Sequence, residues 1–234
     1  SHFGITRESM GAEIVSSMEV VNLGTTSNGA PVYMDKNAYE SDGIIVVNRV
    51  KPHTDFTGDN ESGIVKMVAV GLGKEKGASS MHYFDLASTI PLAYEIARKN
   101  SPILAGLAII ENTSDETSVI KAVEPENFLA IDAAMLKTAY KNVPRLPADE
   151  IDVLIVKQMG KEFSGTGMDT KVIGRIYIDG IAEPVKPKIK KIAVLDLSDH
   201  SGGNALGMGL SDIATKSMID KIDYGATFAN LFPT

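Results

Sequence analysis

The chain has 234 residues and a formal net charge of −7, from 23 Lys and Arg against 30 Asp and Glu. This acidic balance argues against nucleic-acid binding, which needs a clustered cationic face to neutralise phosphates. The longest uncharged apolar run, residues 103–110, is far shorter than the roughly 20 residues of a membrane span, and no secretion signal opens the chain. Because the chain has no cysteine, disulfides and thiolate metal sites are excluded. We expect a soluble cytoplasmic protein that acts through His, Lys, Asp, Glu or Ser side chains or a bound cofactor.

Four short runs of aliphatic residues predict strands that are buried on both faces. They cover residues 42–48, 102–111, 151–157 and 192–197. Such runs, separated by helical patterns, are typical of parallel strands whose sheet is covered by helices.

Two segments between these runs have the pattern of helices. Residues 81–100 predict one helix, which Pro91 is expected to start or to kink. Residues 125–142 predict a second, because their apolar residues recur in one stripe along a helix. The stripe is formed by Phe128, Ile131, Met135 and Ala139.

The alternation of strands and helices predicts an α/β fold with two lobes, each a small sheet of buried strands flanked by helices. We place the lobes at residues 1–148 and 149–234. Two prolines in residues 144–149 favour an extended linker at this boundary. The basic, proline-containing residues 183–191 are expected to form a second connection on the surface.

Only four histidines are present, so each can be weighed as a functional group. His2 lies at the extreme terminus and is not expected to act. His53 follows the 42–48 strand, and the loop that leaves the carboxyl end of a strand is where open α/β sheets bind ligands. A histidine that only bonds a loop carbonyl is the alternative for His53. His200 also follows a predicted strand, and its role stays open between structuring a loop and contacting substrate.

Residues 60–78 combine glycines with lysines, which predicts contact with an anionic ligand such as a phosphate group. The segment matches neither a Walker A loop nor the dinucleotide-binding fingerprint, because its glycine spacing differs from both. The residues expected to face the anion are Gly63, Gly71, Gly73 and Lys74.

Lys66 lies inside an apolar run, where a solvated lysine is not expected. A partly buried lysine loses proton affinity, and its neutral amine attacks electrophiles. The alternative is a lysine that extends from the edge of a strand or helix into water. His82 follows sixteen residues later.

The order of these residues resembles the nickel-dependent lactate racemase family, in a branch of largely uncharacterised members. The resemblance rests on residues 48–58 (NRVKPHTDFTG), 61–67 (ESGIVKM) and 71–79 (GLGKEKGAS), followed by His82. It continues through residues 160–169, 172–175 and 201–212, and so extends over essentially the whole chain.

The resemblance implies a nickel-pincer nucleotide, the pyridinium-3-thioamide-5-thiocarboxylic acid mononucleotide, as cofactor. By position, Lys66 would tether this cofactor as a thioamide, His82 would bind its nickel, and His53 would act as a general acid or base. The absence of cysteine is compatible with this cofactor, because the cofactor supplies the soft sulfur donors that nickel prefers.

The family's activity implies an isomerase that interconverts the enantiomers of a small 2-hydroxy acid by hydride transfer to the cofactor. Gln158 and Lys161 resemble the family's substrate contacts. Asp169, Lys171 and Arg175 fit either a cleft or a buried salt bridge. We expect neither nucleic acid nor membrane as a partner, and the sequence leaves an oligomer open.

The resemblance also predicts that the chain is a fragment without the family's N-terminal region, and that it is inactive by itself. Two other functions stay open. One is a phosphate- or nucleotide-binding module or inert fragment. The other is a hydrolase that binds a hard metal ion through His53, His82 and Asp55.

Overall fold

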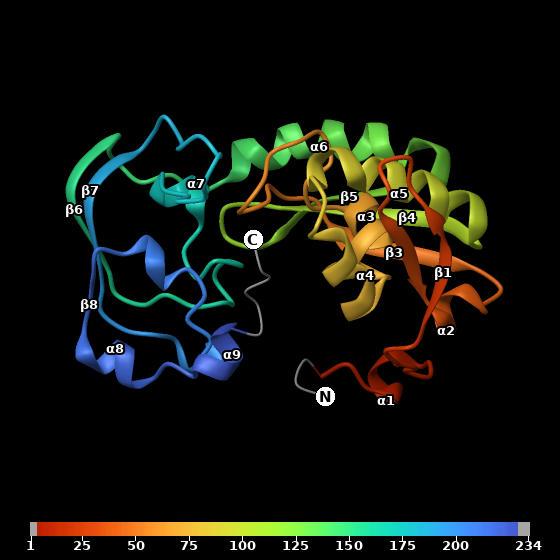
Figure 1. Cartoon of the computed structure of the whole chain (residues 1–234), viewed down its shortest axis with the longest axis horizontal. Coiled ribbons are helices and arrows are strands. Elements are labelled where there is room, and N and C mark those ends of the chain that lie inside the picture. Colours follow the sequence, from red (N-terminus) through yellow and green to blue (C-terminus); the bar gives the residue numbers. More distant parts are fainter. Residues whose placement is uncertain (1–3, 229–234) are drawn as a thin grey trace. The chain divides into compact units, whose positions relative to one another are not determined.

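The computed structural model describes residues 4–228, which form small sheets flanked by helices (Figure 1). His2 lies outside the described residues. The chain is divided into two compact units. The first comprises the residues up to Lys51, Gly58–Ile110 and Thr117–Leu136, and the second comprises Pro52–Thr57, Glu111–Glu116 and the residues from Lys137 on. The division into functional lobes at 1–148 and 149–234 stays a prediction.

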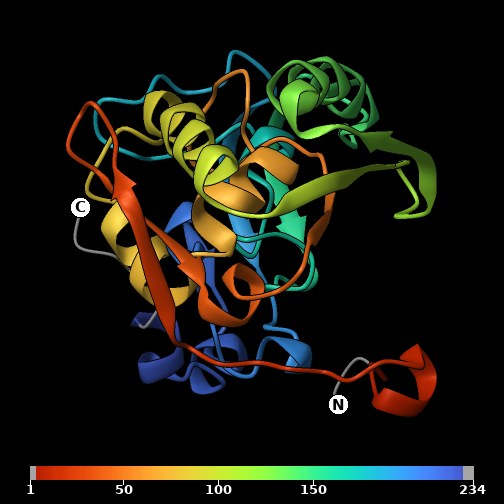
Figure 2. The same cartoon turned by 90° about the vertical axis from the view of Figure 1, so that its right-hand side faces the viewer.

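The first unit contains two sheets. The antiparallel hairpin of β1 (Val20–Thr25) and β2 (Pro31–Asp35) forms one. The other has the order β3 (Ile44–Arg49), β4 (Ile103–Glu111) and β5 (Thr117–Val123), with β3 and β4 parallel. Its helical elements are α1 (Arg7–Met10), α2 (Lys36–Tyr39), α3 (Ile64–Lys66), the π-helix η1 (Met67–Gly71), α4 (Lys74–Met81), α5 (Leu86–Asn100), the 3₁₀ turn η2 (Pro125–Asn127) and the start of α6 (Phe128–Asn142). Figure 2 shows α4 alongside the hairpin.

The core of the first unit is formed by α3, η1, α5 and α6. Ile64, Ile90, Tyr94 and Phe128 are fully buried there, and the rings of Tyr94 and Phe128 stack with their centroids 5.5 Å apart. Burial raises the pKa of the Tyr94 hydroxyl above its usual range, and this hydroxyl donates to a backbone carbonyl. Three members of the predicted stripe on α6, Phe128, Met135 and Ala139, are buried, and the fourth, Ile131, is half-buried.

The second unit contains the sheet β6 (Glu150–Val156), β7 (Lys188–Val194) and β8 (Ile213–Ala214), in that order and entirely parallel (Figure 1). Its other elements are α7 (Thr170–Ile173), η3 (Asp199–Ser201), η4 (Met208–Leu210), α8 (Lys216–Asp220) and α9 (Tyr224–Phe228), together with the end of α6. One sheet face packs on a core that includes Met159, Ile192, Val194, Leu197 and Met218.

The α/β fold class is confirmed, but the prediction that the strands are buried on both faces is wrong for β3 and β6. In β3, Ile45 and Val47 are 62% and 53% exposed, and in β6, Val153 and Ile155 are 56% and 63% exposed. Within residues 4–228, each of these strands buries one face on its unit's core and leaves alternate side chains exposed. A continuous aliphatic run therefore located the strands without specifying what covers their second face.

Two further local predictions need correction. Pro91 lies inside α5 rather than at its start, because the Asp85 side chain caps the helix by accepting from the Ser88 amide, 3.0 Å away. Residues 183–191 are not entirely a connection, since β7 already begins at Lys188. Among the helices of residues 4–228, none has the length and apolarity of a membrane span.

Candidate active site

Lys66 ends the short helix α3 and is followed without a break by the π-helix η1. Its neighbours Ile64, Val65, Val68 and Ala69 are buried, whereas Lys66 itself is half-buried. The apolar run is therefore the core-facing side of a helical segment, and the lysine stands at the edge of that core.

Two distant side chains hold the start of the Lys66 helix. The Asn48 amide of β3 donates to the Gly63 carbonyl at 2.9 Å, and the Asp132 carboxylate of α6 accepts from the Val65 amide at 2.9 Å and the Ile64 amide at 3.4 Å. Asp132 is 2% exposed, and burial raises its pKa to about 6, although both backbone donors act to lower it. The two contacts fix the backbone directly before Lys66.

Glycine is required at position 63 by the closeness of that carboxylate. A Cβ atom on Gly63 would lie 2.4 Å from an Asp132 oxygen, which is closer than atoms can approach. The glycine predicted to face an anionic ligand thus has a packing role against the Asp132 carboxylate.

The second part of the glycine-rich segment begins α4. Gly71 is exposed, whereas Gly73 is buried and caps the helix. Lys74 is paired with Asp35, with 2.7 Å between the ammonium nitrogen and a carboxylate oxygen. Burial alone would raise the pKa of Asp35, but the hydrogen bonds from Lys74 and the Ala38 amide hold it below its ordinary value. Lys74 therefore already has an anionic partner inside the protein, which competes with its predicted role toward a phosphate.

His82 caps the carboxyl end of α4 and is exposed. Its Nδ1 atom lies 2.6 Å from the Ala78 carbonyl oxygen, which can only accept. This contact implies that Nδ1 carries the proton and that Nε2 carries the lone pair. The arrangement resembles that of metal-binding histidines, whose second ring nitrogen is usually held by a hydrogen bond.

His53 belongs to the second unit, in the segment Pro52–Thr57. Its Nδ1 atom accepts from the Asp55 amide at 3.1 Å, which implies that Nε2 carries the proton. The ring lies 4.4 Å from that of Phe56, measured between centroids. Lys171 donates to the His53 carbonyl, and the Thr170 hydroxyl donates to the Thr54 carbonyl at 2.7 Å. Two hydrogen bonds from α7 thereby hold the segment Pro52–Thr57 within this unit.

Lys161 lies in the loop after β6, and the structure brings this loop to the His53 segment. A Cβ atom on Gly165 of the same loop would lie 3.7 Å from the Thr54 hydroxyl. The Lys161 ammonium donates to the Gly165 carbonyl at 2.8 Å. Burial lowers the pKa of Lys161, and the negative charge of Asp55 acts in the opposite direction. Gln158 is exposed at the end of the strand, close in sequence to this group.

Sequence reasoning missed a polar cluster behind Lys161. The Ser201 hydroxyl accepts from the Lys161 amide at 2.7 Å and donates to the Glu162 carboxylate at 3.1 Å. Burial alone would raise the pKa of Glu162, but hydrogen bonds, the largest from Ser198, hold it below its ordinary value. His200 also contributes to this lowering through its charge. The serines lie about forty residues from Lys161, so no local pattern could have connected them.

Arg175 and Asp169 have structural roles. The Arg175 guanidinium is buried and pairs with Asp212 at 2.7 Å, while also donating to the carbonyls of Leu210 and Ile189. This pairing and the Ile192 amide hold the pKa of Asp212 far below its ordinary value. Asp169 caps α7 by accepting from the amides of its first turn. Of the two roles left open for Arg175, the structure supports the buried salt bridge.

The predicted site residues fall into two groups, one in each unit. Lys66 and His82 lie in the first unit, and His53, Gln158 and Lys161 lie in the second. That both groups act in one cleft stays a prediction. Among residues 4–228, no three His, Asp or Glu side chains cluster as metal ligands.

Comparison with known proteins finds one family model that matches part of the chain, and the matched residues include Lys66, His82 and His53. Residues 9–89 match the model of the lactate racemase N-terminal domain. The solved lactate racemase apoprotein from Thermoanaerobacterium thermosaccharolyticum is 15% identical, with a TM-score of 0.47 over 78% of this chain. This chain spans 45% of the length of that protein. No curated protein matches the chain.

Proposed function

Since the chain is lactate racemase-like, with residues 9–89 matching that family's N-terminal domain, we propose that it acts in the interconversion of enantiomers of a small 2-hydroxy acid. The observation that carries the proposal is that the matched segment contains both Lys66 and His82, held on connected helices of one unit. This match supports the presence of part of the N-terminal domain, so the region expected to be missing is smaller than that whole domain.

The residues present fit the nickel-pincer nucleotide that the family implies. Such a cofactor needs one amine for its attachment and one imidazole nitrogen for its nickel, because it brings its own sulfur donors. Lys66 supplies an amine on a half-buried side chain, and its backbone is held by Asn48 and Asp132. His82 supplies an Nε2 lone pair on a ring oriented by the Ala78 carbonyl. When bound, the cofactor would supply an acceptor for the substrate's C2 hydrogen and its bonding electrons.

The second unit supplies the groups for the substrate's oxygen atoms. We assign the binding of the substrate carboxylate to Lys161, supported by Gln158. His53 has its proton on Nε2, so the neutral ring donates a hydrogen bond to a 2-oxo oxygen. It can transfer a proton to that oxygen only as an imidazolium, after it has taken up the 2-hydroxyl proton. To accept the 2-hydroxyl proton at Nε2, the ring must give up its bond from the Asp55 amide and change tautomer. General acid–base help of this kind contributes roughly 10²–10⁴-fold to a rate.

The proposal is tested first by attachment of the cofactor and only then by turnover. The 234-residue chain is supplied with the pincer nucleotide and Ni²⁺, and its intact mass, peptide map and nickel content are measured. We expect one adduct on Lys66 and one nickel per chain. Lys66→Arg should lose the adduct, and Lys76→Arg, an exposed lysine of the same segment, should keep it.

The other outcomes identify the alternatives. Nucleotide binding without an adduct favours a phosphate- or nucleotide-binding module. Zinc or manganese bound to a chain with unmodified Lys66 favours the hydrolase. An adduct that persists in Lys66→Arg contradicts the assignment of the tether. Conversion of one lactate enantiomer by the loaded protein, followed by chiral chromatography, then tests the reaction itself.

A further inference from the structure

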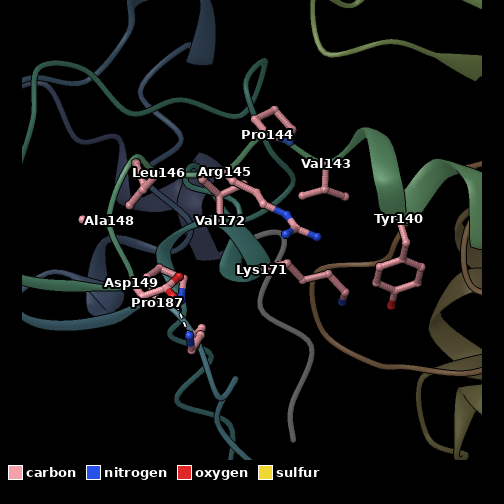
Figure 3. A pocket seen from close by; sticks show the side chains of 11 residues that line it. Tyr140, Val143, Pro144, Arg145, Leu146, Ala148, Asp149, Lys171, Val172 and Pro187 are labelled. Atoms are coloured by element: carbon pink, nitrogen blue, oxygen red, sulfur yellow. Dashed lines mark hydrogen bonds and ion pairs between the residues drawn. The ribbon is translucent and has the colours of Figure 1, made fainter.

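The second unit contains a pocket that the proposed reaction does not use. It has a volume of about 330 Å³ and lies among the end of α6, the following linker, the start of α7 and the loop before β7 (Figure 3). This volume is in the range of sites that bind small organic molecules. The linker predicted from its two prolines therefore forms one wall of a cavity.

The lining of this pocket is positively charged, although the chain as a whole carries a net charge of −7. Three cations, Arg145, Lys171 and Lys186, line it together with a single carboxylate, Asp149. Asp149 pairs with Lys186, so the charges of Arg145 and Lys171 remain uncompensated by lining carboxylates. In Figure 3, the ends of the Arg145 and Lys171 side chains extend toward the same side of the pocket as Tyr140.

Arg145 has no carboxylate partner within residues 4–228. The Lys171 ammonium donates to the His53 carbonyl and lies 5.9 Å from the centroid of the Tyr140 ring. Its two remaining N–H groups are available to a ligand, since an ammonium has three donors. A guanidinium and an ammonium beside one cavity match an anion with several oxygens, because the guanidinium fork binds two oxygens at once.

The remaining walls are apolar. They are formed by the side chains of Val143, Pro144, Leu146, Ala148, Val172 and Pro187. An inorganic anion would leave these walls in contact with water, whereas an organic group attached to the anion would cover them. We propose that this pocket binds the phosphate monoester of a small organic group, with the dianionic phosphate on Arg145 and Lys171. This inference does not depend on the proposed racemase function.

Phenyl phosphate is the probe, and its binding to the 234-residue chain is measured by isothermal titration calorimetry. Phenyl sulfate has the same shape with one negative charge, and inorganic phosphate lacks the organic group. We expect phenyl phosphate to bind at least 10-fold more tightly than either. Its affinity should fall by a similar factor below pH 6, where the phosphate takes up its second proton.

Arg145→Gln should weaken phenyl phosphate binding at least 10-fold, and Arg145→Lys should weaken it less, because the charge remains and the fork is lost. Arg145 is exposed on the linker, so these variants should unfold at the wild-type temperature. Lys216→Gln, which removes an equal charge from exposed α8 of the same unit, should bind like the wild type. Binding equal in Arg145→Gln and wild type, an equal loss in Lys216→Gln, or no binding at 10 mM would each overturn the proposal.

Discussion

Replacing Asp132 with asparagine removes a buried charge while keeping the shape of the side chain. Asp132 is 2% exposed, and burial raises its pKa from 3.8 to about 6. Between these two values the unfolded chain has lost the proton and the folded chain still holds it. The folded state then binds more protons, so the stability that Asp132 contributes falls as the pH rises through this window.

The size of the effect follows from the difference in pKa. A difference of about 2 corresponds to about 3 kcal/mol, because each pKa unit is worth 1.36 kcal/mol. Above pH 6 the wild type carries this cost, and Asp132→Asn does not. The asparagine amide, in turn, leaves one of the two backbone donors without an acceptor, which costs about 1 kcal/mol at every pH.

Urea unfolding of both proteins at pH 4 and pH 7.5 measures the effect. At each pH, the unfolding free energy of the wild type is subtracted from that of Asp132→Asn. The contributions of all other titrating groups cancel in this difference, provided that the groups around position 132 are unchanged. We expect this difference to move in favour of Asp132→Asn by about 2 kcal/mol from pH 4 to pH 7.5, because a small part of the full change lies below pH 4. A difference that stays constant, or that moves in favour of the wild type, would refute the reasoning.

Three further predictions concern other residues. Arg175→Ala should lower the free energy of urea unfolding by about 3–5 kcal/mol, because its buried ion pair with Asp212 loses one partner. The control Lys216→Ala, at an exposed ion pair, should change this free energy by less than about 0.5 kcal/mol. Gly73→Ala should lower the free energy of unfolding by about 1–3 kcal/mol, because the new Cβ would lie 2.8 Å from a backbone atom. The control Gly209→Ala should leave this free energy unchanged, because there is open space around position 209. His82→Ala should abolish retention of nickel in the cofactor-treated protein during gel filtration while leaving the mass adduct in place; full nickel retention would exclude His82 as its ligand.

The strands could be predicted from the sequence, because β-branched and aliphatic runs bounded by polar residues have few other uses. The grouping of the His53 segment with the Lys161 loop was not predicted, because the predicted lobe boundary separates them, whereas the structure puts both in the second unit. What covers each strand face was not predictable. Val47 and Val153 look like core residues in the sequence, and only the arrangement of helices decides that they are exposed.

The burial of Asp132 could be predicted from the sequence, but its hydrogen-bond partners could not. It lies four residues after Phe128 and three before Met135, so a helix places it within the buried stripe of α6. A carboxylate at such a position signals a backbone or cationic partner, because a buried charge needs hydrogen bonds. Its partners are the amides of Ile64 and Val65, 68 and 67 residues away, and no local pattern identifies them.

The π-helix after Lys66 sets the angle at which Lys66 leaves its own helical segment, which ends before α4 begins. Its wide turn, closed by the Leu72 amide donating to the Met67 carbonyl at 2.8 Å, contains one residue more than an α-helical turn. Each residue of an α-helix rotates the chain by about 100°, so deleting one residue from Met67–Gly71 would remove the wide turn and rotate Lys66 by about that angle relative to Leu72, where this helical segment ends. A change of length in Met67–Gly71 would therefore alter the direction of Lys66 as well as its separation from His82 along the chain.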